Sequence, residues 1–200
     1  MTDPTTLQPD PSAISSLSKA PFAHMPRPDR VFRERAERFA VLAEGSRLEP
    51  YLRFLGALSV AQDEVAREMP APEPLPDAQI ERAREGAMPP MDRAALPGHP
   101  AMRATVQLFL DRAEAIEKPA AAQAALAALR EADEAALTEL LLDTVSQTAR
   151  PERAAEQLFV SAAVQVLAAR LAAPLDPARL VPVRTGLCPV CGARPLASMV

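Results

Sequence analysis

Apolar side chains recur every three or four residues in several stretches of this chain, which is the spacing that places them on one face of an α-helix. Ala and Leu dominate these stretches and enter helices at little cost, so the pattern favours helices over strands. The most regular face runs through residues 102–116 and consists of Met102, Val106, Phe109, Ala113 and Ile116. The pattern therefore predicts an all-α protein built as a multi-helix bundle.

Prolines, glycines and capping residues predict where the first helices begin and end. We expect one helix from Asp29, acting as the N-cap, to Glu44, with Gly45 immediately after it. Pro50 opens a second helix that runs to Met69, and the two helices form an αα-hairpin. The expected buried stripe of the second helix is Leu48 or Tyr51, Leu52, Leu55, Leu58 or Ser59, Gln62 and Val65.

Prolines also mark the boundaries of the other segments of the chain. Six prolines within residues 1–28 predict a disordered tail, and residues 29–175 form the helical domain. Eight prolines within residues 70–100 predict an extended crossover with one short helix between Asp77 and Gly86. A helix from Pro119 to Arg130 is followed by another capped by Asp133, although one continuous helix over 119–148 fits the pattern too.

The last predicted helix opens at Pro151 and is apolar on nearly every side between residues 158 and 169. A helix of that kind is buried all round, so we expect it at the centre of the bundle. Its uncharged stretch, residues 157–169, is shorter than the roughly 20 residues that a bilayer span needs. We therefore expect no membrane insertion.

Composition narrows the class of protein further. Basic residues number 22 and acidic residues 26, they form no run of one sign, and the formal net charge is −4. Nucleic acid is not an expected partner, because phosphate binding usually shows as a basic patch. The polar, acidic opening residues do not look like a secretory signal, so the expected location is the cytoplasm.

The candidate chemistry is a thiol pair, Cys188 and Cys191, in Cys188-Pro189-Val190-Cys191-Gly192. In a tight turn both sulfurs point the same way, Pro189 fixes one φ angle, and Gly192 can take the positive φ that follows. Two thiolates are half of the four-ligand shell of a structural metal site. The motif therefore predicts a metal knuckle with Cys188 and Cys191 as ligands.

Two other interpretations of the pair stay open, a thioredoxin-like redox site and two unpaired surface thiols. His24 and His99 are not expected to be ligands, because both lie in irregular segments. No glycine-rich phosphate loop, GxSxG or HExxH motif occurs, so no catalytic residue is predicted and the protein is not expected to be an enzyme. Acidic residues on the predicted helices are interpreted as solvated faces: Asp63, Glu64, Asp133 and Glu134.

Several of these pieces occur in an order that resembles one family, the bacterial formate dehydrogenase accessory (formation) proteins. They are the helix that contains Phe39, the segment Leu48-Glu-Pro-Tyr-Leu-Arg-Phe-Leu55, the apolar helix from Phe159 to Ala172, and the knuckle. The resemblance covers residues 29–200. It implies a cytoplasmic, non-catalytic assembly factor that contacts the catalytic subunit of respiratory formate dehydrogenase. It also implies a rubredoxin-like part that binds iron through several CxxC pairs.

This sequence matches that iron site at Cys188 and Cys191 alone, so residues 176–200 read as an incomplete rubredoxin-like knuckle. We expect a metal site that is incomplete within this chain, a fragment or a shortened protein, and self-association through an exposed apolar strand at 197–200. One alternative is a helical protein-interaction module with a zinc knuckle and no link to formate metabolism. A dithiol oxidoreductase is the third hypothesis.

Overall fold

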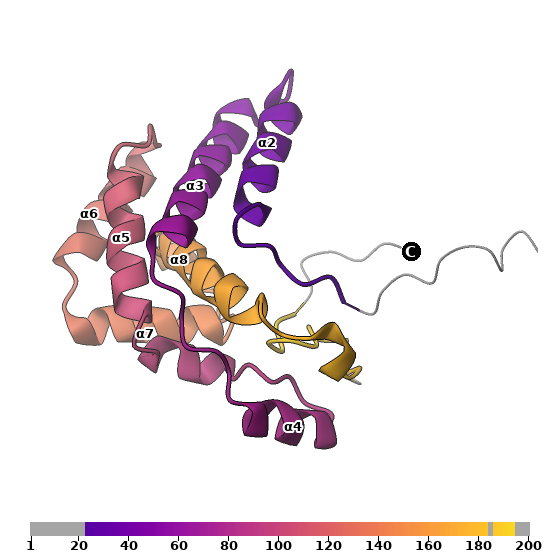
Figure 1. Ribbon diagram of the computed structural model, residues 1–200. Coiled ribbons are helices and arrows are strands. Elements are labelled where there is room, and N and C mark those ends of the chain that lie inside the picture. Colours follow the sequence, from indigo (N-terminus) through magenta and orange to yellow (C-terminus); the bar gives the residue numbers. More distant parts are fainter. Residues whose placement is uncertain (1–22, 184–185, 195–200) are drawn as a thin grey trace, which may run out of the picture.

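The computed structural model describes residues 23–183 and 186–194, and every regular element within these ranges is a helix (Figure 1). The α-helices are α2 (Val31–Ala43), α3 (Glu49–Glu68), α4 (Asp77–Glu85), α5 (Met102–Glu114), α6 (Ala120–Glu131), α7 (Glu134–Val145) and α8 (Ala154–Ala172). Three short 3₁₀ helices are η1 (Arg93–Gly98), η2 (Pro151–Arg153) and η3 (Pro177–Arg179). The prediction of an all-α bundle is confirmed for the described residues.

Helices α2 and α3 form the predicted hairpin and lie side by side (Figure 1). Gly45 has a φ of +67°, the left-handed conformation expected after the end of α2. The predicted N-cap is wrong: the cap position is Arg30, which makes no side-chain cap bond. The physical reason is a backbone turn before α2, in which the N–H groups of Arg30 and Val31 donate to the carbonyl of Arg27 at 2.9 and 2.8 Å.

The buried stripe of α3 differs from the prediction at its start. Val65, Leu58 and Gln62 are buried as expected, but Leu48 and Tyr51 are 60% and 50% exposed. In the chain, both residues lie at or next to the connection between α2 and α3, and this end of the hairpin is at the top in Figure 1. The stripe is therefore covered only where another helix reaches it, and Phe54 begins the buried part.

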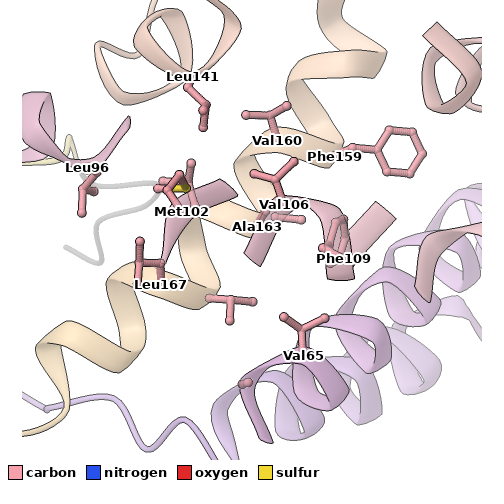
Figure 2. Packing of buried hydrophobic residues seen from close by; sticks show 14 of the residues in the cluster. Val65, Leu96, Met102, Val106, Phe109, Leu141, Phe159, Val160, Ala163 and Leu167 are labelled. Carbon is pink, nitrogen blue, oxygen red and sulfur yellow. The ribbon is translucent and has the colours of Figure 1, made fainter. Parts of the chain in front are cut away.

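Helix α8 contacts α3, α5, α6 and α7, which confirms its predicted central place. Figure 2 shows the core in which its side chains meet those of α5, α7, α3 and η1: Phe159, Val160, Ala163 and Leu167 of α8, Met102, Val106 and Phe109 of α5, with Leu141, Val65 and Leu96. By length and composition alone, the segment Pro151–Ala172 would suffice to cross a membrane. Its place among four helices accounts for that apolar composition without a membrane.

Two helices, α6 and α7, occupy residues 120–145, so the continuous helix considered for 119–148 is wrong. The break lies at Ala132 and Asp133. The Asp133 carboxylate accepts a hydrogen bond of 2.8 Å from the N–H of Ala136, which is the predicted N-cap.

The proline-rich crossover holds the predicted short helix, α4, and also η1, which the sequence pattern did not predict. Met91 and Leu96 of this segment are buried in the core cluster. Ala23 and Met25, from the end of the predicted disordered tail, are half-buried against the same core. The rest of that tail, residues 1–22, lies outside the described residues.

One predicted solvated acid is instead buried. The side chain of Asp63 is 8% exposed and pairs with the guanidinium groups of Arg33, at 3.7 Å, and Arg67. Because α2 covers this side of α3, burial raises the pKa of Asp63, and Arg33 opposes that shift. Glu64, Asp133 and Glu134 are exposed, as predicted.

Candidate thiol site

The thiol pair lies in a tight turn at residues 188–194, the thiol turn, close to the proline-rich crossover. The N–H of Gly192 donates to the carbonyl of Cys188, and the N–H of Cys188 donates to the carbonyl of Ala193, both at 2.9 Å. Gly192 has a φ of +69°, which confirms the conformation predicted for it. A Cβ atom at Gly192 would also lie 3.3 Å from Cγ of Pro89.

Neither alternative interpretation of the thiols fits this geometry well. A thioredoxin-like site places its second cysteine on a helix, whereas Cys191 lies in the turn and residues 186–194 contain no helix. Both thiols are half-buried and pack against the core cluster, unlike exposed surface cysteines.

Two elements of the helical domain hold the turn in place. The N–H of Met91, in the crossover, donates to the carbonyl of Val190 at 2.9 Å. The N–H of Arg194 donates to Oε1 of Gln147, just after α7, at 2.9 Å. Val190 is 8% exposed, so the residue between the two cysteines anchors the turn in the core.

The two thiols interact, and their pKa values shift in opposite directions. A hydrogen bond from the Cys191 thiol lowers the pKa of Cys188 to about 5, against an opposing effect of burial, with help from the N–H groups of Val190 and Cys191 and the charge of Arg93. Donating that bond, together with burial, raises the pKa of Cys191. At neutral pH the site thus holds one thiolate and one thiol, and a metal ion bound to both sulfurs would replace the proton that Cys191 keeps.

Among the described residues, no cluster of three or more His, Cys, Asp or Glu side chains could hold a metal ion. His99 is half-buried, and its Nδ1 accepts a hydrogen bond of 3.1 Å from the N–H of Ala101 at the start of α5. His24 is exposed. Two sulfurs suit iron or zinc, which bind thiolates, but they supply half of a tetrahedral shell.

The residues that surround the thiols were not predicted from the sequence. Pro89 and Met91 were treated as part of a crossover, and Arg93 and Gln147 were not singled out. Arg93 also donates from Nε to the carbonyl of Val145, the last residue of α7, at 3.0 Å. No local pattern marks these residues, because they lie more than 40 positions from the cysteines and meet them only in the folded chain.

A hollow of about 1020 Å³ lies elsewhere, between α3, α5 and the connection to α6. Phe54, Ala57 and Val60 are among its lining residues, and it contains neither cysteine nor histidine. The predicted strand at 197–200 lies outside the described residues, so the incomplete rubredoxin-like knuckle predicted for residues 176–200 stays a prediction.

Comparison with known proteins supports the resemblance seen in the sequence. A family model described as FdhE, N-terminal, matches residues 20–185. A protein FdhE homolog of Rhizobium meliloti (strain 1021) is 52% identical over 97% of this chain and 63% of its own length. A homolog of Pseudomonas aeruginosa is 32% identical over 95% of this chain and 62% of its own.

A solved structure agrees with these relatives. The crystal structure of the FdhE protein from Pseudomonas aeruginosa matches with a TM-score of 0.74 and 33% identity, over 87% of this chain and 60% of that one. The chain thus spans about three-fifths of the length of the relatives it matches. On the family match, the sequence identities and the shared fold, this chain belongs to the FdhE family.

Proposed function

We propose that this chain is the helical part of a cytoplasmic accessory protein that is needed to assemble or activate respiratory formate dehydrogenase. The observation that supports this proposal is the family match, which covers the whole helical bundle up to the thiol turn. In this role the protein has no catalytic activity of its own. Its partner is the catalytic subunit of formate dehydrogenase.

The thiol pair is proposed to supply two ligands of an iron site. Bound iron would cross-link the turn and provide a redox-active centre. The residues of this chain hold two sulfurs on one turn, keep Cys188 as a thiolate, and partly exclude water from both. Further ligands have to come from other cysteines, either in a second chain or in a longer form of the protein, because two thiolates complete half of a shell.

A binding measurement tests whether the catalytic subunit is the partner. The immobilised chain should bind the purified catalytic subunit of a respiratory formate dehydrogenase in biolayer interferometry, with the full-length Rhizobium meliloti relative measured beside it. An unrelated helical protein of similar size and charge serves as control. If neither the chain nor the full-length relative binds the catalytic subunit, the proposed accessory role is wrong.

Zinc is the alternative metal, because Cys thiolates are common ligands of structural zinc sites. A zinc knuckle would fit a helical interaction module unrelated to formate metabolism. Metal analysis after anaerobic purification separates the two, with iron in wild type and its loss on Cys188→Ser as the expected result. Zinc in place of iron, without binding to the catalytic subunit, would favour the interaction module.

Self-association is a further part of the proposal, since half a metal shell can be completed by a second copy of the chain. Sedimentation equilibrium with and without Fe²⁺ tests this directly. A shift toward dimer that depends on metal and is lost in Cys191→Ser supports bridging. A monomer under every condition refutes it.

A further inference from the structure

The thiol turn is attached to the helical domain by contacts that bridge long stretches of sequence. Gln147 and Arg194, which share the bond from the Arg194 N–H to Gln147 Oε1, lie 47 positions apart. Met91 reaches Val190 across a still longer stretch of chain. These bonds join the turn to the end of α7 and to the crossover.

The backbone at Gln147 is in an uncommon conformation. Its φ is +55°, a left-handed value that residues other than glycine and asparagine adopt at a cost. The bonds from the Gln147 N–H to the carbonyl of Thr144 and from the Thr148 N–H to the carbonyl of Asp143 close the end of α7 around it. Glycine or asparagine is the usual residue at such a position. The side chain of Gln147 contacts a residue far away in the sequence. Backbone strain at such a residue indicates that its side chain has a role.

Arg93 completes the arrangement from the other side. Its Nε donates to the carbonyl of Val145 at 3.0 Å, so the crossover is tied to the end of α7 two residues before Gln147. The Arg93 guanidinium also lowers the pKa of both thiols, by its charge at Cys188 and by a hydrogen bond at Cys191. The end of α7, the crossover and the turn thus form one closed set of contacts around Cys188 and Cys191.

We propose that Gln147 is a positioning residue that holds the thiol turn in its ligand-binding conformation before any metal arrives. Its side-chain oxygen fixes the chain just after Gly192, while Met91 fixes the residue between the cysteines. The helical domain therefore presents a preformed pair of sulfurs. The role of this conformation in metal binding rests on the proposed iron site. The geometry of the two sulfurs does not depend on that proposal.

Two variants separate the side-chain bond from the backbone strain. Gln147→Asn keeps a residue that tolerates positive φ, but its shorter side chain cannot reach the Arg194 N–H. Gln147→Glu keeps an acceptor oxygen at the original length. Gln157→Asn is the matched control, because Gln157 bonds the backbone of Thr148 and Arg150 next to Gln147 and has no bond to the turn.

The first readout is amide hydrogen exchange at Arg194 in the metal-free chain. A net hydrogen bond shifts a local opening equilibrium by about fivefold. Exchange at Arg194 should therefore be slow in wild type, about fivefold faster in Gln147→Asn, and unchanged in Gln147→Glu and Gln157→Asn. Unprotected exchange at Arg194 in wild type would overturn the proposal, whatever the variants do.

The second readout is binding of phenylarsine oxide, whose arsenic forms two As–S bonds with a thiol pair and releases one water. A preformed pair binds it more tightly, because less ordering remains to be done. We expect about fivefold weaker binding in Gln147→Asn, with Gln147→Glu close to wild type. Equal affinity in wild type and Gln147→Asn would overturn the proposal. Absence of iron binding would refute the proposed iron site and leave both readouts intact.

Discussion

Substitution of Gly192 by alanine tests how the thiol turn is built. The left-handed conformation, at a φ of +69°, costs an alanine about 1–2 kcal/mol relative to the normal helical or extended regions. The new Cβ would also lie 3.3 Å from Cγ of Pro89, so the proline ring or the turn has to shift. We expect the turn to open at least about tenfold more often, since 1.4 kcal/mol corresponds to a factor of ten.

The assay is native-state hydrogen exchange at the Met91 amide, which bonds the turn at the Val190 carbonyl. Gly186→Ala is the matched control: Gly186 has a φ of +68°, but a Cβ there would meet no atom within 4 Å. Gly192→Ala should therefore accelerate exchange at Met91 more than Gly186→Ala does. If the two substitutions have equal effects, or neither changes the exchange at Met91, the close docking of the turn on Pro89 is wrong.

Three further predictions concern the core, a strained helix end and the thiols. Leu167→Ala, at a fully buried position of α8, should lower the free energy of unfolding by about 2–5 kcal/mol in urea titration, and an effect under 1 kcal/mol would contradict its central place. Ala87→Gly should raise it by about 0.4–1 kcal/mol, because Ala87 has a φ of +48°; a loss would contradict that reasoning. Alkylation of Cys188 by iodoacetamide should follow a pKa of about 5, so the thiol reacts at full rate at pH 7, and Cys191→Ala should move the profile to higher pH by removing the hydrogen-bond donor. A profile centred near pH 8.5 in wild type would refute the lowered pKa of Cys188.

Local sequence patterns predicted the helices because the signals for helix ends are themselves local. Gly45 and Asp133 act at their own helix ends, and the apolar face of residues 102–113 needs nothing beyond a 3.6-residue period. The centre of the bundle was predictable for the same reason, since a helix that is apolar all round has no face suited to water.

The predictions that failed depended on which helix covers which face. Tyr51 continues the stripe of α3 but lies at the hairpin tip, where it is 50% exposed. The sequence pattern places Asp63 on a solvated face, but in the structure α2 covers it and Arg33 pairs with it. Periodicity describes one helix at a time, so it cannot say where a neighbouring helix ends.

At the candidate site, too, local sequence predicted some residues and missed others. The sequence pointed to Cys188, Cys191 and the positive φ of Gly192, all within five consecutive residues. Gln147 and Arg93 could not be predicted, because the bond of Gln147 to the turn and the bond of Arg93 to the end of α7 arise from the packing of α7 and the crossover. Spacing therefore identified the sulfurs, and the fold identified what holds them.

X-ray absorption at the iron edge tests the central claim most directly, with the chain loaded anaerobically with Fe²⁺. The account predicts sulfur scatterers in the first shell of wild type, and their loss in the Cys188→Ser, Cys191→Ser double variant. A first shell of oxygen and nitrogen alone in wild type would contradict the assignment of Cys188 and Cys191 as iron ligands.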